Sequence, residues 1–219
     1  MSRIDPKLQE YIQDLMQRYV QLKSAEEDLI QSFLLLKETF QEGNKLLICG
    51  NGGSAADSEH IVGELMKGFI LPRSIGNEME QKLCTVAPKE GKVLADKLQM
   101  ALPAIALTGH NALSTAFLND VDGKICYAQQ VLGYGKPGDA FWGISTSGNS
   151  ANVVYAAVTA KAKGMKVIGL TGKLGGKLAD LADVCMKVDE TETYKIQELH
   201  LPVYHCLCMM LEQAFFAMP

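Results

Sequence analysis

Two side chains that can move protons stand four residues apart in the stretch LLICGNGGSAADSEHIVGE at 46–64. They are His60 and Glu64, and an i, i+4 pair lies on one face of a helix. A histidine and a carboxylate placed in this way can act as an acid–base pair or bind a metal ion. A solvated surface pair is the alternative, and the spacing alone favours it over catalysis.

The residues ahead of this pair predict how it is positioned. Residues 46–49 are four apolar residues in a row, as in a short buried strand. Gly52 and Gly53 permit a tight turn and a close backbone approach to a ligand, and Asn51 or Ser54 can cap the helix that follows. Helix N-terminal amides beside glycines suit a phosphate. An ordinary strand–turn–helix junction is the alternative.

A second polar loop, STSGNS at 145–150, lies between an apolar run and a helical stretch. Together with helix N-terminal amides, its hydroxyls can donate several hydrogen bonds to one phosphate without a lysine. The loop lacks the GK[ST] ending of a Walker loop. Capping alone needs fewer hydroxyls, so we interpret the loop as a phosphate site rather than a polar turn. The hydroxyls belong to Ser145, Thr146, Ser147 and Ser150.

The final helical stretch, from about residue 194 to 216, carries Gln197 and His205. Eight residues are about two turns, so these two side chains face nearly the same way. Their neighbours Leu201, Tyr204 and Leu207 are typical of a core, and a histidine among such residues is more often structural than catalytic. Three of the four histidines nevertheless lie on this helix and on the helix of Glu64.

Apolar runs alternate with helical stretches along the chain, which predicts an α/β fold with a parallel sheet. We expect five strands, at 45–50, 103–107, 140–144, 166–170 and 184–188. The loops after the first four strands should meet at the carboxyl edge of the sheet, where such folds bind ligands. These loops are 50–54, 108–120, 145–150 and 171–176.

Residues 1–44 predict a pair of amphipathic helices ahead of the sheet. We expect a break between them near 23–25, where Ser24 and Glu27 fit a capping box. Their apolar stripes need a cover, and packing between subunits is our interpretation.

Residues 45–219 are expected to form one domain, and residues 68–101 interrupt it as a mixed insertion without a clear period. The stretch from Lys92 to Met100 has the character of a short helix. We interpret the insertion as a surface loop, with a lid or a functional insertion as the alternative.

Composition limits the classes of function. The net charge of −4 argues against broad binding to nucleic acid or to an anionic membrane. The sequence has no apolar stretch long enough to span a bilayer and no recognisable signal peptide, so we expect a cytoplasmic protein. The six cysteines lie mostly in apolar runs and are expected to be buried, reduced thiols.

The motifs taken together resemble the sugar isomerase (SIS) domain family, and within it the phosphoheptose isomerases. STSGNS alone implies only a SIS domain, whereas its combination with Glu64 and His205 is more specific. The resemblance implies a three-layer αβα fold with an N-terminal helical pair. The matching segments cover almost the whole chain from 45 to 216: CGNGGSAAD at 49–57, HIVGE at 60–64, ND at 119–120, GISTSGNSANV at 143–153, GMKVIGLTGKLGGKLA at 164–179 and IQELHLPVYH at 196–205.

The resemblance also implies a reaction, the interconversion of sedoheptulose 7-phosphate and glycero-manno-heptose 7-phosphate through an enediol. The catalytic pair would be Glu64 and His205. Such enzymes are homotetramers with active sites at subunit interfaces, and no nucleotide cofactor is expected. Zinc in metal-binding members is held at positions that match His60, Glu64, Gln197 and His205. The expected substrate-binding residues are Asn51, Gly52, Gly53, Ser54, Asn119, Asp120, Ser145, Thr146, Ser147, Ser150 and Gln197.

The chemistry fits these residue types. Moving a proton between C1 and C2 needs a base at carbon and an acid at the carbonyl oxygen. Glu64 is the expected base, and His205 is the acid or a second proton carrier. Zinc can instead polarise the carbonyl, but a carboxylate bound to zinc is a poorer base, and the sequence leaves both alternatives open.

Segment 68–101 is longer than the link expected at this point in phosphoheptose isomerases. This departure puts the identity of the sugar substrate in question more than the type of reaction. Two other classes of function stay open. One is the non-catalytic branch of SIS proteins that bind the bacterial replication initiator. Members of this branch lack the catalytic glutamate and histidine. The other is a sugar-phosphate sensor, for which the sequence shows no DNA-binding segment.

Overall fold

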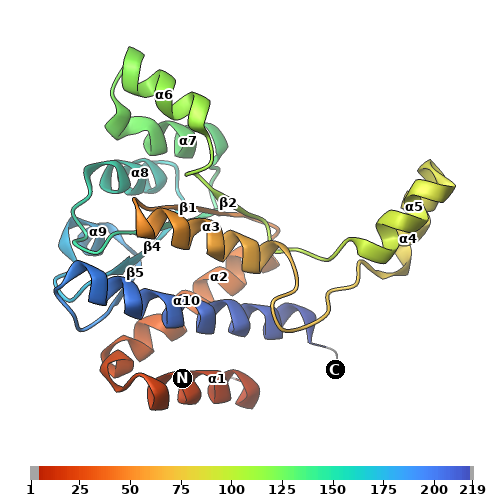
Figure 1. Cartoon of the computed structure of the whole chain (residues 1–219), viewed down its shortest axis with the longest axis horizontal. Coiled ribbons are helices and arrows are strands. Elements are labelled where there is room, and N and C mark those ends of the chain that lie inside the picture. The colour runs from red at the N-terminus through yellow and green to blue at the C-terminus, as the bar shows by residue number, and fades with distance from the viewer. Residues whose placement is uncertain (1–4, 218–219) are drawn as a thin grey trace.

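The computed structural model describes residues 5–217. The first four residues of the predicted segment 1–44 and the last two of the predicted segment 45–219 therefore lie outside the described part. At its centre is a five-stranded parallel sheet with the strand order β2-β1-β3-β4-β5 (Figure 1). Each strand lies within one residue of its predicted position, which confirms the α/β fold. The strands are β1 (Leu46–Cys49), β2 (Ala104–Ala106), β3 (Ala140–Ile144), β4 (Lys166–Thr171) and β5 (Val184–Lys187).

Helices connect and cover these strands throughout the described residues. Short 3₁₀ helices lie at Val20–Ala25 and Gly123–Ile125. None of the helices in residues 5–217 is both long and apolar enough to cross a membrane. The α-helices are α1 (Pro6–Arg18), α2 (Glu26–Gln41), α3 (Gly53–Met66), α4 (Gly76–Val86), α5 (Pro88–Lys97), α6 (Asn111–Asp120), α7 (Cys126–Tyr134), α8 (Ala151–Ala162), α9 (Gly176–Leu181) and α10 (Thr193–Phe216).

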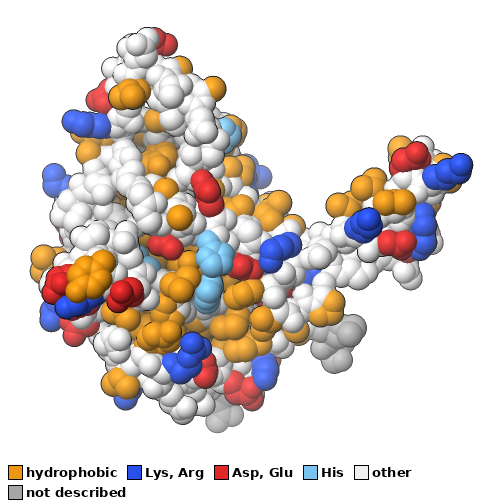
Figure 2. Space-filling view, in the orientation of Figure 1, with side chains coloured by type: hydrophobic (Ala, Val, Ile, Leu, Met, Phe, Trp, Pro, Cys, Tyr) orange, Lys and Arg blue, Asp and Glu red, His pale blue; other side chains and the backbone are white. Residues whose placement is uncertain are grey.

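The insertion at 68–101 is a helical hairpin, and the expectation of a surface loop is wrong. Helices α4 and α5, which we call the arm, stand apart from the body of the molecule (Figures 1 and 2). Two chain segments, 68–75 and 98–101, connect the arm to the body, and we call them the neck. Gly91 of α5 lies so close to Leu83 of α4 that a Cβ would overlap its backbone, so this glycine lets the two helices pack together.

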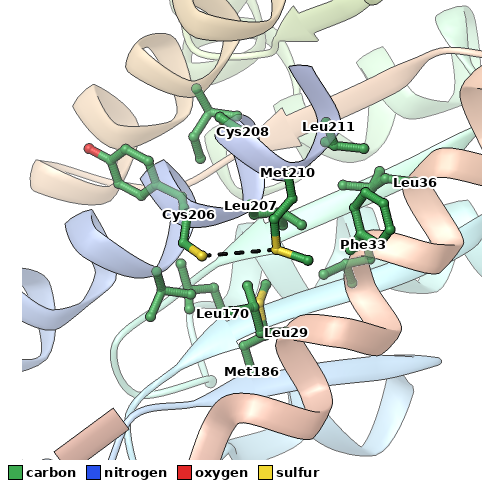
Figure 3. Packing of buried hydrophobic residues seen from close by; sticks show 14 of the residues in the cluster. Leu29, Phe33, Leu36, Leu170, Met186, Cys206, Leu207, Cys208, Met210 and Leu211 are labelled. Carbon is green, nitrogen blue, oxygen red and sulfur yellow. Dashed lines mark hydrogen bonds between the residues drawn. The ribbon is translucent and has the colours of Figure 1, made fainter. Parts of the chain in front are cut away.

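Helices cover both faces of the sheet. Successive side chains of a strand point to opposite sides, so neighbouring residues of β1 belong to different cores. Leu46 and Ile48 belong to one core with α1, α2, α3 and α10. Figure 3 shows part of this core, where Phe33 of α2 faces side chains of α10. Leu47 and Cys49 belong to the other core, with α7, α8 and α9. The structure therefore has the three-layer αβα arrangement that was expected.

The N-terminal helices pack against their own chain. The 3₁₀ helix between α1 and α2 lies at the predicted break, but the capping box is absent, because Ala25 is the N-cap of α2 and no side chain caps it. Leu15 of α1 and Leu29 of α2 are buried in the core that α10 completes. The apolar stripes are thus covered within one subunit, and a role of this pair in oligomer packing stays a prediction.

A fully buried ion pair fixes the neck to the body. Arg73 Nε donates to Glu212 Oε1 at 2.8 Å, and neither side chain is exposed. The Glu212 carboxylate, on α10, also accepts the three backbone N–H groups of residues 69–71 at 2.7, 2.8 and 3.1 Å. Arg73 in turn donates to the carbonyl oxygens of Leu65 and Glu64. The pair therefore ties together the neck, α10 and the last turn of α3.

Replacing Glu212 by glutamine should lower the free energy of unfolding by about 3–5 kcal/mol, because Arg73 would stay buried without its counter-charge. Denaturant unfolding followed by circular dichroism measures this change. The matched control is Glu78→Gln, which removes an exposed ion pair to Lys82 on the arm and should cost less than about 1 kcal/mol. Equal losses in the two variants would contradict the anchoring role.

Candidate active site

The turn after β1 brings the backbone to the ligand-binding edge of the sheet. Gly52, at φ 55°, is the N-cap of α3, and no side chain caps the helix, so the predicted capping by Asn51 or Ser54 is wrong. The Asn51 amide instead pairs with the amide of Asn152 on α8 through hydrogen bonds of 2.9 and 2.8 Å. Ser54 is buried. The amide pair holds the N-terminal ends of α3 and α8 side by side.

The STSGNS loop forms a compact cradle at the start of α8. Ser145 is buried and its Oγ donates to Ser150 Oγ at 3.0 Å, while Thr146 is half-buried and Ser147 exposed. Gly148, at φ 65°, lies so close to the turn after β4 that a Cβ would overlap that backbone. The cradle therefore depends on a glycine at this position.

A surface hollow of about 480 Å³ lies between the cradle and the turn at residues 50–53, which we call the glycine turn. Its lining includes Lys124, a positive charge beside the N-terminus of α8, which sequence reasoning missed because no motif marks it. Asn119 and Asp120 are exposed at the end of α6, next to lining residues, and hydrogen-bond to each other at 2.7 Å. The hollow is lined by Asn51, Leu118, Asp122, Gly123, Lys124, Ser150, Ala151 and Asn152.

Helices α3 and α10 run side by side in the same direction. At their beginnings, the Gln197 amide approaches Gly53 so closely that a Cβ there would lie 2.6 Å from Nε2. Further along, the Tyr204 hydroxyl of α10 reaches Asp57 of α3. Gln197 thus lies at the glycine turn, about 12 Å along the helix axis from His205.

His60, Glu64 and His205 meet where the two helices face each other. His60 Nε2 is 3.1 Å from Glu64 Oε1 and 3.5 Å from His205 Nε2. Lys67 Nζ lies 3.4 Å from the second oxygen of the buried Glu64 carboxylate. Burial and the neighbouring His60 lower the pKa of His205, so its ring is neutral near pH 7. The predicted acid–base pair is therefore brought together, with His60 between its members.

This cluster lies on an open face of the molecule. Figure 2 shows histidine side chains at the surface over α3 and α10, with hydrophobic side chains around them. His205 also lines a hollow of about 250 Å³ between α1 and α10. The imidazole rings of His60 and His205 are therefore accessible to a ligand, while the Glu64 carboxylate lies buried beneath them.

Tyr204 links His60 to a second carboxylate. Its hydroxyl is 3.0 Å from His60 Nδ1 and donates to Asp57 Oδ1 at 3.1 Å. Both contacts form together when His60 Nδ1–H donates to the hydroxyl, and Nε2 then donates to Glu64 only while the ring carries its second proton. Burial, followed by the charge of Asp57, raises the pKa of the buried Tyr204, so the hydroxyl keeps its proton. The sequence indicated only that Tyr204 is a core residue.

Nitrogen and oxygen donors of the kind that zinc prefers are present at His60, Glu64 and His205. With bonds of about 2.1 Å, neighbouring ligands of a tetrahedral zinc ion stand about 3.4 Å apart, close to the two distances at His60. Gln197, however, lies at the other end of the helix pair. Within residues 5–217, no group of three or more His, Cys, Asp or Glu side chains is arranged to hold a metal ion. The four predicted zinc ligands are therefore not brought together within the described part of one chain, and zinc binding stays a prediction.

Comparisons with known proteins agree with this geometry. A family model described as SIS domain matches residues 86–172. The phosphoheptose isomerase of Aneurinibacillus thermoaerophilus is 36% identical over 216 residues, covering 95% of this chain and 96% of that protein. The chain belongs to the phosphoheptose isomerase family.

Solved structures of phosphoheptose isomerases have the same fold. The structure from Neisseria gonorrhoeae is 31% identical, with a TM-score of 0.69, and covers 95% of this chain and 94% of its own. The structure from Francisella tularensis is 28% identical, with a TM-score of 0.71, and covers 95% of this chain and 97% of its own. The expected SIS fold is confirmed.

Replacing Gly148 by alanine should weaken the binding of inorganic phosphate by at least about tenfold, because the added Cβ has no room and the positive φ disfavours it. Isothermal titration calorimetry measures the dissociation constant. Gly133→Ala is the matched control, since nothing lies within 4 Å of a Cβ at that position. Unchanged phosphate affinity in a folded Gly148→Ala protein would exclude the cradle as the phosphate site.

Proposed function

We propose that this protein is an aldose–ketose isomerase that converts sedoheptulose 7-phosphate into glycero-manno-heptose 7-phosphate. The observation that carries the proposal is the meeting of Glu64 and His205 across His60, on a helix that begins beside the phosphate-type cradle. The names of the relatives support the substrate. The presence of both Glu64 and His205, each beside His60, supports an enzyme over the non-catalytic SIS proteins.

The phosphate end of the sugar is assigned to the cradle. Hydroxyls of Ser145, Thr146, Ser147 and Ser150 and the backbone amides at the start of α8 donate hydrogen bonds to its oxygens. The start of α3 lies beside this site and adds a second positive helix end. Lys124 contributes a full positive charge to the same hollow.

The proton transfers are assigned to the cluster on α3 and α10. The Glu64 carboxylate takes a proton from C1 of the ketose while the neutral His205 ring gives a proton to the carbonyl oxygen at C2, which yields the enediol. Glu64 then returns its proton to C2, and His205 takes one from the hydroxyl at C1, which becomes the aldehyde. The two groups end in their starting protonation states, and no step passes through a metal ion.

We further propose that the active sites lie at subunit interfaces of a homotetramer. From Gly53 to Glu64, α3 is about 16 Å long. An extended heptose 7-phosphate spans only about 10 Å from its reacting carbons to phosphorus, given carbon–carbon bonds of about 1.5 Å. This difference in length supports a site in which one subunit holds the phosphate in its cradle and a neighbouring subunit supplies Glu64.

A cytoplasmic location is proposed from the thiols. All six cysteines are free, and five of them are buried. Free thiols in this number are usual in a reducing compartment.

Turnover of sedoheptulose 7-phosphate by the purified protein tests the proposed function, with added zinc in one arm and a chelator in the other. Formation of the aldose phosphate in both arms would support proton transfer by Glu64 and His205 alone. Loss of activity with chelator and recovery with zinc would assign the polarisation of the carbonyl to a metal. No conversion by a protein that still binds sugar phosphates would contradict the proposed substrate.

Glu64→Gln and His205→Ala should each lower kcat by about 10²–10⁴-fold, because each removes one of the two proton carriers. Steady-state kinetics measure the loss, and circular dichroism shows whether the variants stay folded. The control is Glu59→Gln on the same helix, whose carboxylate bonds to Thr108 and faces away from the cluster. Normal turnover in either active-site variant would exclude the assigned roles.

Tyr204→Phe should lower kcat about tenfold with little change in KM, because His60 loses the hydroxyl that orients its ring. Tyr11→Phe is the matched control, since it also removes a side-chain hydrogen bond of α10, to Gln213 at 3.5 Å, but lies away from the cluster. The ratio of kcat values in the two variants is the measurement. Equal kinetics would show that the hydroxyl serves only stability.

A further inference from the structure

The arm has an apolar surface that its own described chain leaves open. Met79, Val86, Val93 and Leu94 are 45%, 86%, 54% and 42% exposed. α4 contains no buried residue, and α5 contains only one, Gly91. Helices of 11 and 10 residues are marginal in water unless they pack against another surface. The arm therefore needs a cover that its own body does not provide.

The charges of the arm neutralise one another. It carries four lysines and four acidic residues, so its net charge is zero while that of the chain is −4. Lys82 pairs with Glu78, and Lys92 pairs with both Glu80 and Asp96. The arm thus has no charge excess to attract nucleic acid or a charged protein. Two arms can approach each other without the repulsion that the acidic bodies exert.

The neck presents the arm in a defined direction. Ser74 and Gln99 form an antiparallel bridge, and Gln99 Oε1 also accepts the N–H of Gly68. The buried pair of Arg73 and Glu212 fixes the same segment to α10. The arm is therefore held out from the body before any partner binds (Figure 1), which reduces the entropy lost on association.

We propose that the apolar faces of two arms pack against each other, so that a second copy of this chain covers the arm. The same patch would serve on both copies, as in a two-fold symmetric interface, and four helices would form a small bundle. Figure 2 shows hydrophobic side chains gathered along one edge of the arm, where this contact would lie.

The size of the face decides what the contact can do. A helix of 11 residues is about 16 Å long, and two adjacent helices are about 20 Å wide, so the face measures on the order of 300 Å². Stable interfaces bury about 800 Å² on each partner. The contact between arms therefore reinforces an assembly held by other surfaces and does not create one alone.

Cys84 provides a reporter for this contact. It lies half-buried on α4, whereas the other five cysteines are buried. A short bis-maleimide added to the purified full-length protein should join two chains through Cys84, and Cys84→Ser should abolish the covalent dimer. Val86→Glu combined with Leu94→Glu should lower the dimer yield at least tenfold. The matched control is Lys89→Gln on the same arm, which should leave the yield unchanged.

Absence of the covalent dimer in the unmodified protein, or equal yields in the Val86→Glu/Leu94→Glu variant, would overturn the proposal. An oligomer that does not cross-link would show that the arm contacts another surface, which also overturns it. Labelling of Cys84 with a single maleimide shows that the thiol is reactive in every variant. None of these readouts depends on isomerase activity, so the result stands apart from that of the turnover assay.

Discussion

The carboxylate of Glu212 joins three parts of the molecule that come from separate places in the chain. It accepts three backbone N–H groups of the neck and the guanidinium of Arg73, at a site without solvent access. Arg73 donates hydrogen bonds to the carbonyl oxygens of Glu64 and Leu65 in the last turn of α3. Because neither charge can remain buried alone, α3, α10 and the neck are fixed relative to one another. The approach of Glu64 to His205 and the direction of the arm both follow from this one site.

Helices α3 and α10 run parallel to each other. Their beginnings lie beside the cradle, and the cluster of His60, Glu64 and His205 lies further along both helices. Their first turns lie at the carboxyl edge of the sheet, where Gln197 meets Gly53 beside the cradle. Further along, His60 and Glu64 of α3 face His205 of α10, and the ring of His60 lies between Tyr204 and Glu64. The polar cradle and the His60–Glu64–His205 cluster therefore lie at different points along the same pair of helices.

The sequence predicted what depends on local pattern. Buried parallel strands leave uninterrupted apolar runs that end at glycines, so all five were placed, and the i, i+4 spacing identified His60 and Glu64. Properties that depend on distance through space were missed. The eight-residue spacing of Gln197 and His205 predicted that they share a helix face. It did not show that about 12 Å along the helix axis keeps their side chains apart. The hydroxyl of Tyr204 bonds to a residue 147 positions away. The arm was missed because its short helices bury almost nothing, and burial is what leaves an apolar pattern.

The bridge between Ser74 and Gln99 has a consequence for how the family can vary. The arm leaves and rejoins the body at one point, so the frame that carries the active residues does not depend on what lies between. The entropy of closing a loop rises only slowly with its length, and the closing contacts are already made in the neck. Residues 75–98 can therefore lengthen, shorten or change partners without disturbing the sheet. The arm can therefore change in sequence and length independently of the residues around His60, Glu64 and His205.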